Sequence, residues 1–171
     1  MDDVFRSAKG RHPMRRFSTV LLAISMIATG PAAAMAGQAK PGARTIEINA
    51  TDDMKFSVTT ITAKPGEALH IRLNVISKMP KVAMAHNFVL FTAATTAKQL
   101  NDFVTQAATK GPVTYIPEDM KKLVLASTTM GGAGQVVEVT FNAPKEAGSY
   151  TYLCSFAGHF LVGMKGTLVV K

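Results

Sequence analysis

The chain has 171 residues, of which 47% are hydrophobic; it contains one Cys and no Trp, and its formal net charge at pH 7 is +8. This composition fits one globular domain preceded by a short extra segment, and a single Cys excludes an internal disulfide. The lysines are scattered and are not interleaved with aromatic residues, so the charge favours acidic protein partners or membrane surfaces over nucleic acid.

The N-terminal segment has the order of a secretory signal peptide. A basic stretch at 11–16 precedes an apolar run at 17–28, and small residues follow up to Ala36. The apolar run is shorter than the ~20 residues that a membrane-spanning helix needs. We therefore expect residues 1–36 to be removed on export. This takes away five of the 19 Lys and Arg and two of the 11 Asp and Glu, which leaves a net charge of +5.

Two translation starts and two export routes fit the sequence. Translation from Met1 or from Met14, which opens a basic start of its own, fits the sequence. The pair Arg15-Arg16 fits a twin-arginine signal, but such a pair is ordinary in any signal peptide, which favours a Sec-type route.

After a short linker at residues 37–43, alternation of apolar and polar residues predicts β-strands. The alternation is clearest at 46–49, 69–75 and 137–141. Such a pattern is typical of strands that bury one face. Further strands, separated by turn-forming Gly and Pro pairs, are expected at 55–63, 87–91, 122–126, 149–154 and 166–170. About eight short strands at this spacing indicate an all-β antiparallel sandwich or barrel.

One segment, residues 95–109, has helical periodicity instead. Its apolar residues recur at a spacing of three to four: Ala97, Leu100, Val104 and Ala107. Either Thr95 or Thr96 could cap this helix. We expect one short helix-bearing insertion in the β-structure.

Two of the four histidines are candidates for a functional site. His12 lies in the signal segment, and His70 lies on the polar face of the strand at 69–75, so we interpret it as solvent-facing. His86 is different, because it lies among methionines at the entry to a strand. His159 lies in the loop that also contains the Cys.

That loop concentrates metal-binding residues. In YLCSFAGHFLVGMKG, residues 152–166, Cys154 is followed by His159 and then by Met164, each five residues on. Together with His86, these residues offer two imidazoles, a thiolate and a thioether. Two His and one Cys with a long axial Met form a blue-copper site, because sulfur donors select copper. Zinc is the competing metal, although it gains little from a thioether.

The sequence resembles the cupredoxins, in particular azurins and auracyanins. TYLCSFAGHFLVGMKGTLVV resembles their copper loop, MPKVAMAHNFVL their first-histidine segment, and DDMKFSVTTITAKPGE the N-terminal strands of azurins. The resemblance implies a Greek-key β-sandwich at 44–171 that holds one type 1 copper ion and passes single electrons in the periplasm. It implies His86, Cys154 and His159 as equatorial ligands and Met164 as the axial ligand.

The resemblance has departures. Four residues separate His159 from Met164, as in auracyanins, whereas azurins have three; the azurin disulfide is absent, and Phe88 replaces a Trp. Ala85 replaces the azurin Gly whose carbonyl is a distant fifth donor, so four ligands are inferred and the fifth contact is left open. Asn87 matches the azurin Asn that steadies the ligand loops.

The expected function is one-electron transfer and not enzyme catalysis. Copper delivery or storage with the same ligands is the alternative. Cys154, His159 and Asn87 could imitate a Cys-His-Asn protease, but no helix N-terminus is expected near Cys154 to lower its pKa. We expect a monomer without stable membrane insertion. Its expected partners are redox proteins of the cytochrome or copper oxidase/reductase type, which dock on an apolar ring around His159.

Overall fold

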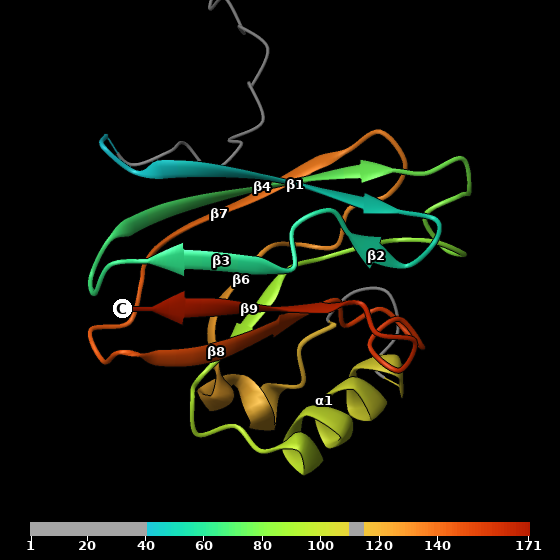
Figure 1. Cartoon of the computed structure of the whole chain (residues 1–171). Coiled ribbons are helices and arrows are strands. Elements are labelled where there is room, and N and C mark those ends of the chain that lie inside the picture. The colour runs from blue at the N-terminus through green and yellow to red at the C-terminus, as the bar shows by residue number, and fades with distance from the viewer. Residues whose placement is uncertain (1–40, 110–114) are drawn as a thin grey trace, which may run out of the picture. The chain divides into compact units, whose positions relative to one another are not determined.

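Two β-sheets pack face to face in the computed structural model, which describes residues 41–109 and 115–171 (Figure 1). The first sheet has the order β2-β1-β4-β7. Its strands are β1 (Arg44–Thr51), β2 (Lys55–Phe56), β4 (Ala68–Ile76) and β7 (Val136–Asn142). The second sheet has the order β3-β9-β8-β5-β6. Its strands are β3 (Thr60–Ala63), β5 (Val89–Phe91), β6 (Val124–Ser127), β8 (Gly148–Leu153) and β9 (Lys165–Val170). The expected β-sandwich is confirmed.

The sheets are mixed, which corrects the expectation of purely antiparallel pairing. β1 pairs with β4 in parallel, with Ile46 beside Ile71, and β3 pairs with β9 in parallel, with Ile61 beside Leu168. The other strand pairs are antiparallel. The pair β1–β4 is parallel because the chain crosses to the second sheet at β3 and returns before β4 begins. A crossover of this kind brings the next strand back in the same direction.

The core lies between the sheets and follows the sequence alternation. On β4, Leu69, Ile71 and Leu73 are fully buried, and Val75 nearly so. Leu69, Ile71 and Leu73 pack with residues of the facing sheet, such as Tyr152 and Leu168, in one cluster. Burial of apolar side chains from both inner faces is what joins the two sheets.

Two strand boundaries differ from the prediction. The expected strand at 55–63 is two strands, β2 and β3, because the chain changes sheets between them. The expected strand at 122–126 begins only at Val124, since its first residues belong to the 3-10 helix η1 (Glu118–Leu123). Period-two alternation cannot distinguish a straight strand from two short strands in different sheets.

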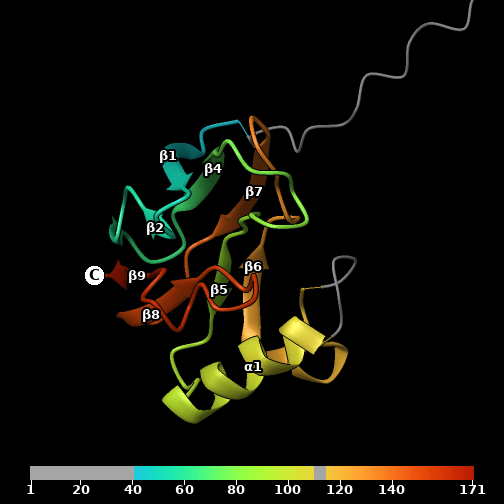
Figure 2. The same ribbon diagram turned by 90° about the vertical axis from the view of Figure 1, so that its right-hand side faces the viewer.

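The predicted helix is α1 (Ala97–Thr109). Thr96 caps it: the Gln99 N–H donates to the Thr96 hydroxyl (3.3 Å), and the Gln99 amide oxygen accepts from the Thr96 N–H (2.8 Å). Its buried residues Phe103 and Val104 pack with Phe91. Figure 2 shows the helix below β5 and β6, where it covers part of the second sheet.

His70 is buried, so the prediction that it faces solvent was wrong. Only 3% of it is exposed; its Nδ1 lies 2.7 Å from the Thr140 hydroxyl, and its Nε2 lies 3.7 Å from Glu138. β4 is a central strand between β1 and β7, so side chains of both neighbours flank His70. The expected signal peptide at 1–36 lies outside the described residues. Within the described ranges, no helix is both long and apolar enough to cross a membrane.

Candidate metal centre

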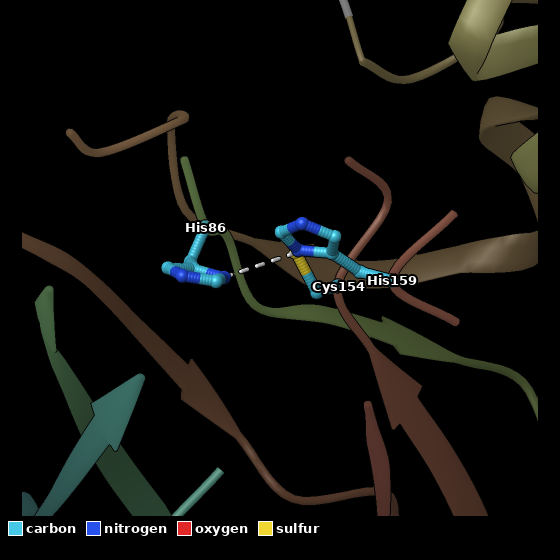
Figure 3. A group of neighbouring side chains, drawn as sticks. All are labelled: His86, Cys154 and His159. Carbon is cyan, nitrogen blue, oxygen red and sulfur yellow. Dashed lines mark hydrogen bonds between the residues drawn. The ribbon is translucent and has the colours of Figure 1, made fainter. Parts of the chain in front are cut away.

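His86, Cys154 and His159 meet at one end of the sandwich (Figure 3). The Cys154 sulfur lies 3.9 Å from Nδ1 of His86 and 3.5 Å from Nδ1 of His159. One potential ligand atom of each residue lies within 4.8 Å of those of the other two. This is the spacing at which three donors can share one ion.

Strand pairing places His86 beside Cys154 although 68 positions separate them. β5 and β8 pair antiparallel, with Val89 opposite Leu153, so the residues just before β5 come close to the residues just after β8. The main chain of His86 is also fixed from the other side. Its N–H donates to the Gly131 carbonyl (2.9 Å), and the Gly131 N–H donates to the His86 carbonyl (2.8 Å).

The loop between β8 and β9 brings His159 and Met164 to the same end. Backbone bonds close it, from the Cys154 N–H to the Met164 carbonyl (3.2 Å) and from the Met164 N–H to the His159 carbonyl (3.0 Å). Gly158 and Gly163 have φ of 85° and 92°, a conformation that glycine adopts without a steric cost. The loop therefore holds Cys154, His159 and Met164 around its base.

The four residues are almost completely shielded from solvent. His86, Cys154 and Met164 are 0% exposed and His159 is 2% exposed. Burial lowers the pKa of both His86 and His159 to about 4, with the neighbouring histidine as a further cause for His159. Burial also raises the pKa of the Cys154 thiol to about 12. The imidazoles are thus neutral and able to donate lone pairs, and a bound metal would have to displace the thiol proton.

A family model of copper binding proteins, the plastocyanin/azurin family, matches residues 43–171. The chain belongs to this family. It is 36% identical over 129 residues to azurin from Pseudomonas denitrificans, an alignment that covers 74% of this chain and 97% of that azurin. It is 33% identical over 129 residues to auracyanin-B from Chloroflexus aurantiacus, covering 75% of this chain and 52% of auracyanin-B. These matches confirm the resemblance to azurins and auracyanins.

The solved structures agree with the family assignment. Auracyanin A, a "blue" copper protein from Chloroflexus aurantiacus, matches this cupredoxin with a TM-score of 0.67 and 31% identity, covering 76% of this chain and 100% of auracyanin A. Reduced auracyanin from Roseiflexus castenholzii matches with a TM-score of 0.65 and 27% identity, covering 76% and 99% of the two chains.

The residues present fit one type 1 copper ion. A buried thiol and two neutral imidazoles converge, and Met164 packs in the same cluster as Cys154. Soft sulfur and imidazole donors are those that copper prefers in both oxidation states. In addition, His86 Nε2 is buried without a hydrogen-bond partner among the described residues, while its Nδ1 is the nitrogen near the sulfur. Copper is the cofactor of this cupredoxin, which is an electron-transfer protein and not an enzyme.

A polar network beside the centre joins the segments that carry His86 and Cys154. The Asn87 side chain bonds to the Ser155 N–H and hydroxyl, and the Ser155 hydroxyl donates to the Tyr115 carbonyl (2.8 Å). Tyr115 stacks on Phe156 (5.7 Å between ring centroids), and Phe156 lies 4.7 Å from the His159 ring. Ser155 and Tyr115 are not among the site residues that the sequence predicted. The position of Ser155 directly after Cys154 was the available signal, whereas nothing local pointed to Tyr115.

The Ala85 carbonyl also points toward the centre. Its oxygen lies 3.9 Å from the Cys154 sulfur, and Ala85 is fully buried. The methyl group that this chain has in place of the azurin glycine therefore does not turn the carbonyl away.

Proposed function

We propose that this cupredoxin is a periplasmic one-electron carrier whose copper is held by His86, Cys154, His159 and Met164. The convergence of two buried imidazoles on a buried thiol carries the proposal. When bound, the copper supplies one-electron chemistry by alternating between Cu(II) and Cu(I). The Ala85 carbonyl is close to the sulfur but is not counted among the four ligands.

The protein contributes a rigid frame to this chemistry. The two Gly131 bonds fix the main chain at His86, and the backbone bonds of Met164 fix the base of the loop. Ligands that are held in place before and after the electron arrives move little, so little reorganisation opposes the transfer. Hydrogen bonds around the sulfur tune its electron donation and thereby the potential.

The burial of Cys154 argues against the thiol-enzyme alternative. A cysteine nucleophile needs a lowered pKa and some exposure. Cys154 has neither, because it is 0% exposed and burial raises its pKa to about 12. This supports metal binding by the sulfur over attack on a substrate.

Partner proteins are proposed to dock on an apolar patch beside His159. The exposed residues of this patch are Met79, Val82, Leu161 and Val162. Leu161 and Val162 follow His159 in the loop, Met79 and Val82 precede His86, and Phe156 and Phe160 flank His159 in sequence. An exposed apolar surface of this kind is typical of a contact site, and a small one suits a carrier that must leave its partner quickly.

Export is part of the same proposal. The match to the family model begins at residue 43, seven positions after the proposed cleavage behind Ala36. The segment before it has the charge and hydropathy order of a signal peptide. We propose that residues 1–36 direct export and that residues 37–43 link to the copper domain.

The visible absorption spectrum of the exported form, residues 37–171, tests the proposal. After one equivalent of copper(II), an intense thiolate-to-copper band should appear, bleach with ascorbate and return on oxidation. Cys154→Ser should abolish the band. His86→Ala should also remove it, whereas His70→Ala should leave it; the reverse result would disprove the ligand assignment.

The competing role, copper delivery or storage, predicts a different outcome. A delivery protein should give up its copper to a chelator within a few redox cycles. An electron carrier should keep its copper through many cycles, because the metal is its permanent cofactor.

A further inference from the structure

We propose that a rim of lysines around the apolar patch selects a redox partner whose docking face carries carboxylates. The rim consists of Lys55, Lys78, Lys81 and Lys165. The inference rests on the proposed function, since it concerns the surface through which the copper would exchange electrons. It goes beyond that function because it states the charge of the partner's docking face.

Two rim lysines contact the copper loop itself. The Lys55 ammonium group donates to the Val162 carbonyl, a residue of the patch, at 3.0 Å. The Lys165 ammonium group lies 5.5 Å from the centre of the Phe160 ring, and Phe160 directly follows His159. Both charges are therefore held beside the patch by contacts with its own segment.

The other two lie in the segment that also contributes Met79 and Val82. The side-chain methylenes of Lys81 lie against Gly132, so close that a Cβ built on this glycine would be 2.7 Å from the Lys81 Cβ. Gly132 follows Gly131, the residue that pairs with His86. Lys78 is exposed in the same segment. Two of the lysines thus contact the loop that contains His159, and two lie in the segment that precedes His86.

These lysines lack carboxylate partners within the described part of the chain. By contrast, Lys98 pairs with Asp102 (2.7 Å) and Lys121 with Glu118 (2.6 Å). The Asp52 carboxylate accepts the Lys78 backbone N–H (3.1 Å), and within the described residues it forms no ion pair with a rim lysine. The rim is positive and its ammonium groups are available for an incoming partner.

The apolar patch and its positive rim together indicate which kind of protein docks on this surface. An apolar face desolvates on contact, while unpaired lysines at its edge favour carboxylates on the partner and speed the encounter. A second copy of this chain would bring its own lysines against these, and like charges across an interface cost free energy. The partner inferred for this surface is therefore an acidic redox protein.

The test compares two protein probes with the same haem and opposite surface charge. Native cytochrome c is basic, and partly succinylated cytochrome c is acidic. In stopped flow, each reduced cytochrome gives one electron to copper(II), forming oxidised cytochrome and copper(I). At ~0.01 M salt we expect the acidic probe to react at least about tenfold faster. The difference should disappear toward ~1 M salt, where the Debye length falls to about 3 Å.

Matched variants locate the effect. Lys55→Gln, Lys81→Gln and Lys165→Gln combined should remove most of the preference for the acidic probe. Lys64→Gln, Lys145→Gln and Lys171→Gln combined make the same change in net charge at positions after β3, before β8 and after β9, and should leave the preference in place. The blue band shows that each variant still holds copper. The salt dependence of the unmodified protein tests the proposal even if a variant fails to load.

The outcomes separate this inference from the proposed function. A protein that develops no blue band, or exchanges electrons with neither cytochrome, refutes the proposed function. Equal rates with both cytochromes at low salt would overturn the proposal of a partner-selecting lysine rim but not the proposed function. An equal loss of the preference for the acidic cytochrome in the two triple variants would have the same meaning. Binding to phosphatidylglycerol vesicles that depends on the rim lysines, together with equal cytochrome rates, would also overturn it, because the rim would then contact a membrane.

Discussion

Asn87 and Ser155 tie together the two segments that carry the proposed ligands. The Ser155 N–H donates to the Asn87 side-chain oxygen (2.8 Å), and the Asn87 amide donates to the Ser155 hydroxyl (2.9 Å). Both residues are buried, and each directly follows a proposed ligand, His86 or Cys154. The pair therefore fixes how far apart the imidazole and the thiol can move.

Asn87→Ala should destabilise the metal-free protein. It leaves the buried N–H and hydroxyl of Ser155 without these partners, which costs about 1–3 kcal/mol. Urea unfolding measures the effect. The control is Asn101→Ala, because Asn101 is exposed and its amide bonds only to the Ala97 carbonyl on the helix surface; its change should be within about 0.5 kcal/mol. Equal losses in both variants would contradict a special role for the Asn87 pair.

The stability of the metal-free protein should fall as the pH is lowered from about 6.5 toward 4. Burial lowers the pKa of His86 and His159 from 6.5 to about 4, so in this window the unfolded chain binds protons that the folded chain does not. Stability is then highest above pH 6.5 and is lost on acidification, by roughly 1–3 kcal/mol per pH unit.

Urea unfolding at pH 7, 6 and 5 measures this slope. The double variant His86→Gln, His159→Gln should have a flatter slope over the same range, because glutamine does not titrate. An unchanged slope in the double variant would show that other groups cause the acid sensitivity.

Met164→Gln should keep a coloured copper site and lower its reduction potential. An amide oxygen is a harder donor than a thioether and favours copper(II) over copper(I). A decrease of at least about 59 mV, a tenfold shift in the one-electron equilibrium, is expected by voltammetry. The control is Met79→Gln, because Met79 is 41% exposed in the patch. If both variants kept the original potential, Met164 would not be the axial ligand.

Gly166→Ala should strongly destabilise the fold. A Cβ on Gly166 would overlap the ring and hydroxyl of Tyr152, a fully buried residue whose hydroxyl donates to the Val58 carbonyl (2.6 Å). Displacing such a side chain costs about 1–3 kcal/mol or more. Gly148→Ala, also in a strand, is the control, because its Cβ would lie at an ordinary 3.7 Å from Tyr150. Thermal unfolding compares the two, and similar midpoints would refute the predicted clash.

Local sequence was sufficient to predict the secondary-structure elements whose formation depends on neighbouring residues. The helix at α1 was predicted because its capping threonine and apolar spacing are local features. The fold class and the copper cofactor, which the alternation and the ligand loop predicted, are confirmed. The assignment of His86, Cys154, His159 and Met164 as ligands stays a prediction, although the structure brings the first three within reach of one ion.

The sequence by itself determined the strands, the helix and the composition of the ligand loop, because periodicity and loop spacing depend only on residues that are close in sequence. Only the tertiary structure decided what lies next to what. It buried His70 between two neighbouring strands, made two strand pairs parallel, and placed Asn87 against Ser155 and Tyr115 beside Phe156. Those relationships depend on strand pairing and packing between residues far apart in the chain, so they cannot be predicted from a local sequence pattern.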